Sequence, residues 1–138
     1  MSKQSYTVLS APLQYLTGEV RYKHLRLHVW DLDKGDHVYN KGGVTIAYRY
    51  LTPTETNRAL GVDNEMAIVV GFAGCSWEDN FDRTLGRSIA SKRLAKSQVV
   101  ISGEQNIKRL MTASDPMHVT DILSKPMQVQ GLRLELCA

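Results

Sequence analysis

Cysteines are scarce in this 138-residue sequence, and no hydrophobic run is long enough to cross a membrane. The two cysteines, Cys75 and Cys137, are too few for a disulfide framework and are typical of a protein from a reducing compartment. The longest apolar runs, such as residues 66–70, fall far short of the roughly 20 residues that span a bilayer. The first residues also lack the apolar core of a signal peptide. We therefore expect a cytoplasmic protein without a membrane segment.

The sequence has little excess charge of either sign. Seventeen Lys and Arg residues against fourteen Asp and Glu residues give a formal charge of +3, smaller than a domain-wide nucleic-acid-binding surface would carry. Hydrophobic residues (43%) and charged residues (22%) occur at the frequencies of an ordinary globular protein, which excludes disorder and coiled coil. No repeat or Pro/Gly-rich linker divides the chain. These features predict a single domain over residues 1–138.

Positive charge is concentrated in two short segments. Every charged residue from position 83 to position 96 is basic, and the segment 21–28 combines three basic residues with two histidines. Two compact basic surfaces suit a small anionic ligand better than a long polyanion. Either segment taken alone is explained equally well as part of an ordinary solvent-exposed surface.

Hydrophobic patterning predicts an α+β fold, an antiparallel sheet with helices that cover one face. We expect turns at 33–36 and 40–43, and strands at 25–32, 37–39, 44–51, 66–73 and 98–102. Thr52, Pro53 and Glu55 form the signature of a capping box, which predicts a short helix that ends near Gly61. Short helices at 106–112 and 119–123 and a weak strand pattern at 127–136 follow.

The best-defined expected element is a helix from Trp77 to about Ala95. Ser76 is the expected N-cap, and acidic residues near the start and basic residues near the end complement the helix dipole. Apolar residues at four-residue spacing form its buried stripe: Phe81, Leu85 and Ile89.

Gly86 and Ala90 lie one turn apart in this helix. Glycine in a helix interior costs about 1 kcal/mol relative to alanine, so its presence predicts the close approach of another backbone, such as a helix of a partner subunit, or of a ligand. Arg83, Arg87 and Arg93 would surround such a gap, and guanidinium groups match the oxygens of phosphate. Helix-dipole and i,i+4 pairing explain Arg93 and Arg83 equally well, whereas Arg87 has no acid three or four residues away.

Two aromatic residues, Trp77 and Phe81, lie one turn apart near the start of the same helix. Aromatic rings stack on nucleobases, although core packing is the commoner role of such a pair. The strand–helix junction at 71–76 lacks the lysine and the glycines of a phosphate-binding loop.

Catalytic and metal-binding patterns are weak. The histidines accompany no Cys or Glu cluster, and no carboxylate pair stands out for acid–base chemistry. Cys75 beside a helix start, paired with His118, is conceivable as a nucleophilic site, but an inert cysteine is the commoner case. We therefore predict a binding protein that is not an enzyme and that needs neither a metal nor a cofactor.

Two segments resemble small proteins encoded by bacteriophages. They are Lys41–Arg49 and Gly71–Leu94, the second with the pattern Gly-Phe-Ala-x-Cys-Ser-x-x-Asp-x-Phe-x-Arg-x-x-Gly-Arg-x-Ile-Ala-x-x-Arg-Leu. The pattern is most similar to the Thoeris anti-defence family, proteins that sequester signalling nucleotides made by host immune enzymes. The resemblance covers roughly the central 55 residues.

The resemblance implies a protein that binds cyclic ADP-ribose isomers, or cyclic oligonucleotides, in the cytoplasm of an infected bacterial host. It also implies a dimer or hexamer with ligands held between subunits. Phe81, Arg87 and Arg93 would be positions in the ligand pocket. Lys92 stands where the family pattern leads us to expect a small residue, which bears on the width of that pocket.

Together these observations define one expected ligand site and one further basic site. The expected ligand-binding residues are Trp77, Phe81, Arg83, Arg87 and Arg93, and the possible second site comprises Arg21, Lys23 and Arg26. An alternative function is a small phage DNA- or RNA-binding regulator that places the basic helix 77–95 on a phosphate backbone. A third is an enzyme built on Cys75.

Overall fold

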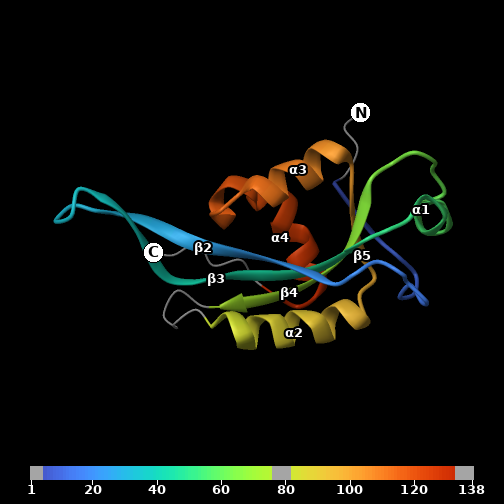
Figure 1. Cartoon of the computed structure of the whole chain (residues 1–138), viewed down its shortest axis with the longest axis horizontal. Coiled ribbons are helices and arrows are strands. Elements are labelled where there is room, and N and C mark those ends of the chain that lie inside the picture. The colour runs from blue at the N-terminus through green and yellow to red at the C-terminus, as the bar shows by residue number, and fades with distance from the viewer. Residues whose placement is uncertain (1–4, 76–81, 133–138) are drawn as a thin grey trace.

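A five-stranded antiparallel sheet organises the chain in the computed structural model (Figure 1). The structure describes residues 5–75 and 82–132, apart from the side chains of residues 27–31 and 36–41. The spatial order of the strands is β1-β5-β4-β3-β2. Their bounds are β1 (Tyr6–Val8), β2 (Arg21–Asp31), β3 (Asp36–Tyr50), β4 (Ala67–Cys75) and β5 (Val99–Ser102).

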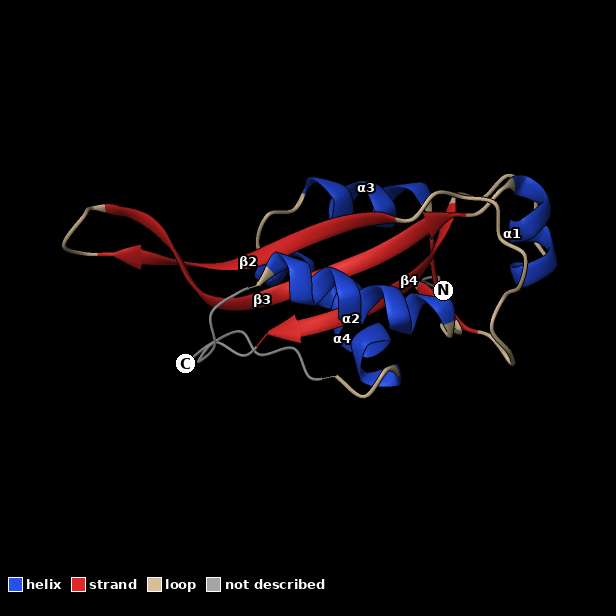
Figure 2. Ribbon diagram, turned by 60° about the horizontal axis from the view of Figure 1, so that its bottom comes forward, coloured by secondary structure: helices blue, strands red, loops and turns tan. Residues whose placement is uncertain are grey.

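Helices cover both faces of this sheet. Their bounds are α1 (Pro53–Leu60), α2 (Arg83–Ala95), α3 (Glu104–Thr112) and α4 (Thr120–Val129), with a 3₁₀ helix at Pro116–Val119. Figure 2 shows α2 across one face, and α3 and α4 lie on the other (Figure 1). The predicted α+β class is confirmed as a single small domain with an antiparallel sheet. The helices flank the sheet on two sides rather than one because β4 is apolar on both faces.

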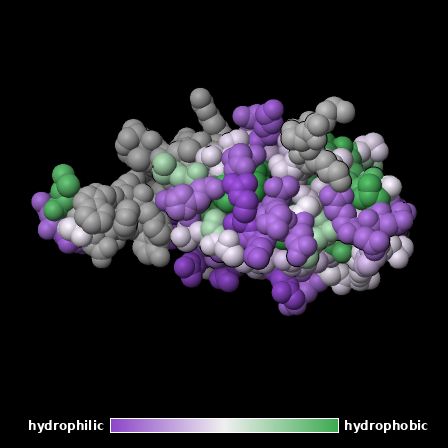
Figure 3. Space-filling view, turned by 90° about the horizontal axis from the view of Figure 1, so that it is seen from above, coloured by the Kyte–Doolittle hydropathy of each residue, from purple (hydrophilic) through white to green (hydrophobic). Residues whose placement is uncertain are grey.

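The two faces of the sheet have cores of different kinds. The larger core packs Phe72, Ile46 and Ile68 against side chains of α3 and α4 such as Leu110 and Met127. The surface over α3 is largely hydrophilic (Figure 3), so this amphipathic helix turns its apolar side to the sheet.

Small side chains form the core beneath α2, which brings that helix close to the sheet. Ala47, Ala73 and Ala90 meet there with Val69 and Leu94. A Cβ atom at Gly71 would lie 2.7 Å from Leu94 Cα and closer still to Leu94 N and Ala90 O. Gly71 therefore permits the close contact between β4 and α2, and α2 carries the basic residues discussed below.

β3 is one continuous strand of 15 residues, and the expected turn at 40–43 is wrong. Gly42 and Gly43 have positive φ angles of 91° and 146°, and the register with β2 shifts nearby, between Arg26 and His28. The glycines thus mark an irregularity within a paired strand, because pairing with β2 and β4 overrides the local turn signal.

The start of α2 also differs from the expectation. The helix begins at Arg83, and Asp82 is its N-cap, with the Asp82 carboxylate accepting a hydrogen bond from Leu85 N at 3.0 Å. Asp82 has extended backbone angles, so the expected helix cannot run through it from Trp77. The expected strand at 127–136 is wrong over 127–129, which belong to α4. No sequence signal predicted β1.

The capping box of α1 is confirmed, and it also holds a distant loop. Thr52 Oγ1 accepts a hydrogen bond from Glu55 N at 3.2 Å, and Glu55 Oε1 accepts one from Thr52 N at 2.8 Å. The second oxygen, Glu55 Oε2, accepts a hydrogen bond from Thr17 N at 3.2 Å. Burial opposes ionisation of Glu55, but these hydrogen bonds prevail and lower its pKa below the ordinary value.

Replacing Glu55 by glutamine is expected to lower the free energy of unfolding by about 1 kcal/mol at pH 7, because a neutral amide accepts these bonds more weakly. The folded-state pKa lies below the ordinary 4.5, so the stabilisation is present above that pH and is lost as the pH falls through the folded-state pKa. Urea denaturation at neutral and acid pH checks this, with the exposed Glu104→Gln as the control. A difference from wild type that stays the same in acid would contradict the assignment.

Candidate anion-binding site

Within residues 5–75 and 82–132, no strand pairs with β4 beyond Val69 on the side of β5, because β5 is much shorter than β4. Only Ala67, Ile68 and Val69 pair with β5. The side-chain amide of Gln130, at the end of α4, takes the place of a strand: its Oε1 accepts from Phe72 N at 2.9 Å and its Nε2 donates to Val70 O at 3.0 Å. From the other face of the sheet, Arg93 donates to Phe72 O at 2.7 Å. The ends of α2 and α4 thus converge on one strand edge.

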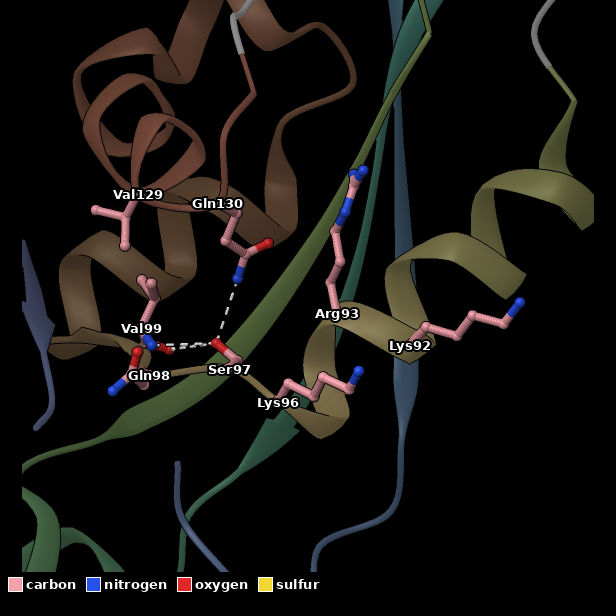
Figure 4. A pocket seen from close by; sticks show the side chains of 8 residues that line it. All are labelled: Lys92, Arg93, Lys96, Ser97, Gln98, Val99, Val129 and Gln130. Carbon is pink, nitrogen blue, oxygen red and sulfur yellow. Dashed lines mark hydrogen bonds between the residues drawn. The ribbon is translucent and has the colours of Figure 1, made fainter. Parts of the chain in front are cut away.

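A hollow of about 340 Å³ lies between these two helix ends. Its lining residues are Lys92, Arg93, Lys96, Ser97, Gln98, Val99, Val129 and Gln130 (Figure 4). Figure 4 shows Gln130 reaching from α4 toward Ser97, while the three basic residues project from the last turns of α2. The lining contains three cationic side chains and no acidic one.

Hydrogen bonds fix the polar wall of the hollow. Ser97 Oγ accepts from Val99 N at 3.1 Å and from Gln130 Nε2 at 3.3 Å. Arg93 is half-buried, and its bond to Phe72 O uses one of the five N–H donors of a guanidinium group. The Gln130 amide and the Ser97 hydroxyl are thus used within the chain, and the groups left for a ligand are the remaining N–H donors of Arg93 and the positive charges of Lys92 and Lys96, which favour an anion.

A second hollow, of about 830 Å³, has the opposite character. It lies beside α1, and acidic side chains line it: Asp63, Glu65 and Glu104. Carboxylates repel phosphate, so this larger hollow is unsuited to the expected ligand.

The structure separates Arg83 and Arg87 from Arg93. Arg87 lies on the flank of α2 that faces β2, where its guanidinium carbon is 5.9 Å from the centre of the Tyr22 ring. Arg93 is on the opposite flank, against β4. The three arginines therefore do not surround a common gap.

The expected role of Gly86 and Ala90 as a contact for a partner subunit or a ligand is wrong. A Cβ atom at Gly86 would lie 3.1 Å from Thr45 Cβ and closer to Thr45 Oγ1, and Ala90 is fully buried. This face of α2 packs against the chain's own sheet, so the close approach that the glycine signals is intramolecular.

The basic residues of β2 do not form one group either. Lys23 Nζ donates to Met111 O at 2.9 Å, on the side of the sheet that carries α3. Arg21 shares that side by strand alternation, as does Leu25, which is buried in the larger core. Arg26 follows Leu25 and so projects from the other side. Trp77 and Phe81 lie outside the described residues.

Across residues 5–75 and 82–132, no three His, Cys, Asp or Glu side chains gather to hold a metal ion. Cys75 is half-buried at the end of β4, and His118 is exposed on the 3₁₀ helix. Within the same ranges, the helices are too short and too polar to serve as a membrane span.

Sequence reasoning identified Arg93 and the basic run of α2 but not the other lining residues. Ser97 and Gln98 follow the helix end and carry no motif, and Gln130 meets β4 from 60 residues away. In comparisons with known proteins, no family model, no curated protein and no solved structure matches this chain.

Proposed function

We propose that this protein binds a small phosphate-bearing nucleotide in the hollow between α2 and α4 and sequesters it unchanged. The observation that carries the proposal is the lining, which combines three basic side chains from the end of α2, Lys92, Arg93 and Lys96, with the amide of Gln98 and contains no acidic side chain. The volume, about 340 Å³, lies within the range of roughly 300–1,000 Å³ that is usual for small-ligand sites.

The two ends of the hollow suit the two parts of a nucleotide. The basic side chains of α2 can pair with phosphate oxygens, Arg93 through a planar fork and the lysines as point charges. Gln98 offers an amide to a ribose or a base edge, and Val129 offers apolar contact. The resemblance to the Thoeris anti-defence family adds the proposed ligand class: a cyclic ADP-ribose isomer or a cyclic oligonucleotide made by a host immune enzyme.

The chemistry of the lining favours binding over turnover. Its one hydroxyl, Ser97 Oγ, accepts hydrogen bonds from Val99 N and Gln130 Nε2 and donates one to Val99 O, so it is hydrogen-bonded to no side chain that could act as its general base. We therefore propose a role without catalysis, in the cytoplasm of an infected bacterium.

Sequestration at nanomolar concentration requires about 12 kcal/mol of binding free energy, which favours an enclosed ligand. Val129 at the rim of the hollow is 46% exposed, an apolar side chain that a second copy of the chain could cover. We propose a dimer or hexamer in which a neighbouring subunit closes each hollow.

Calorimetric titration tests the proposal, with cyclic ADP-ribose, a cyclic dinucleotide and ADP-ribose as ligands and adenosine as the phosphate-free control. We expect at least one phosphorylated ligand to bind and adenosine not to bind. Denaturing the complex should then release the ligand with its mass unchanged. Absence of binding to every phosphorylated ligand would contradict the proposal, and recovery of an altered ligand would favour the enzyme built on Cys75.

A DNA- or RNA-binding regulator is the second candidate, and one observation favours it. The basic side chains at positions 83, 87 and 92 of α2 and that of its C-cap, Lys96, are all exposed, and the helix carries no acidic residue. Polyanion binding weakens steeply with salt because counterions are released, whereas a closed pocket loses much less affinity. Gel-shift and calorimetric measurements at low and moderate salt therefore separate the two functions.

A further inference from the structure

The flank of α2 that faces β2 forms a second basic surface, separate from the hollow. We call it the β2-side flank and define it by Tyr22 and His24 of β2 together with Arg83, Arg87 and Ser91 of α2. It exists because Gly86 lets α2 lie directly on Thr45, which brings one row of helix side chains against the edge strand of the sheet.

Hydrogen bonds fix the floor of the β2-side flank. The Tyr22 hydroxyl and Ser91 Oγ are 2.6 Å apart, which joins the strand to the helix. His24 Nδ1 lies 2.9 Å from Oγ1 of Thr45, a side chain that is fully buried. Both rings are therefore positioned before any ligand arrives, so little entropy is lost when one binds.

Two guanidinium groups stand over this floor. Arg83 and Arg87 are one helical turn apart and exposed, and like charges at that spacing repel each other. Neither forms an ion pair with any residue in 5–75 or 82–132. Asp82, the acidic residue next to them in the described chain, caps the helix by accepting from Leu85 N.

Both charges act on His24. Burial is the largest cause that lowers the pKa of His24, and the positive charges of Arg83 and Arg87 lower it further. The charged and polar groups that face this imidazole include the two arginines of α2, the Thr45 hydroxyl of β3 and, by strand alternation, Arg26 two residues along β2. At neutral pH the site has two permanent cations beside a neutral ring.

We infer that the β2-side flank is a second anion site, which holds a phosphate group between Arg83 and Arg87 above His24. A phosphate dianion relieves the repulsion between the arginines, which lie within one turn of each other. The Tyr22 ring, 39% exposed, adds an apolar surface beside the anion for whatever the phosphate is attached to. The site shares no residue with the hollow between α2 and α4.

Histidine NMR tests this inference directly, with inorganic phosphate as the probe and chloride at matched ionic strength as the reference. A bound dianion favours the imidazolium form, so phosphate should move the pKa of His24 upward and saturate in the millimolar range. His118, exposed on the 3₁₀ helix, is the internal control and should not respond. An unchanged His24, or an equal shift of both histidines, would overturn the inference.

Two variants separate this site from the hollow. Arg83→Gln/Arg87→Gln should remove the phosphate response of His24 and leave nucleotide binding in the hollow intact. Lys92→Glu/Lys96→Glu should do the reverse. Retention of the His24 response in the first variant, or its loss in the second, would overturn the second site without affecting the function proposed for the hollow.

Discussion

Replacing Lys92 and Lys96 together by glutamate is expected to weaken nucleotide binding at least about 100-fold. Hydrogen bonds to charged groups contribute about 1.5–3 kcal/mol each, and the variant replaces two such donors by two groups that repel phosphate. Every 1.4 kcal/mol is a factor of ten in affinity, so even the lower figure for two lost contacts gives a loss of about 100-fold. Calorimetric titration with the ligand that wild type binds measures the change.

The matched control reverses the charge of two lysines that lie away from the hollow. Lys108 in α3 and Lys125 in α4 are exposed and lie outside the lining of the hollow. Lys108→Glu/Lys125→Glu has the same net charge as the test variant. Any difference in nucleotide affinity between the two variants therefore comes from the position of the substituted lysines. Equal affinity of both variants would place the ligand somewhere other than the hollow.

The substitution Gly71→Ala is expected to destabilise the protein by about 3 kcal/mol or more, near or above the upper end for an overpacked core. The new Cβ would collide with Leu94 and Ala90 through their backbone atoms, which cannot turn aside as a side chain can. Helix α2 would have to move away from β4, and both basic surfaces move with it. Urea denaturation gives the loss of stability.

Gly74 on the same strand supplies the control. A Cβ atom there would have Leu132 Cδ2 and Met127 Cε at 4.0 Å, which is ordinary contact. Gly74→Ala should therefore change the free energy of unfolding by less than about 0.5 kcal/mol. Similar losses of stability in the two variants would mean that α2 does not approach β4 as closely at Gly71 as the structure shows.

Local signals predicted much of the fold, and the errors occur where distant pairing decides the structure. The capping box of α1 involves Thr52 and Glu55 alone and was predicted in full. Gly42 and Gly43 have the composition of a turn, yet Gly43 pairs with Arg26 of β2 on one side and with Cys75 of β4 on the other. At the start of α2, Ser76 and Asp82 are both suitable caps by residue type, and only the folded chain selects Asp82.

The candidate site was predictable only in part, for a similar reason. Basic residues of one helix can be counted from sequence, but the flank that each occupies depends on how the helix lies on the sheet. Arg87 reaches Tyr22 across 65 positions and Arg93 reaches Phe72 across 21, in opposite directions. No local pattern records the contact of Gln130 with β4.

The contact of Gln130 with β4 protects the protein against association through this strand edge. An exposed strand edge with open main-chain groups invites strands of neighbouring molecules, the first step toward fibrils. The carboxamide of Gln130 already occupies Phe72 N and Val70 O, so an incoming strand would have to displace it. Under the proposed function, each protein molecule removes a fixed number of ligand molecules, so the protein would have to accumulate to high concentration, and the contact of Gln130 with β4 would protect this strand edge there.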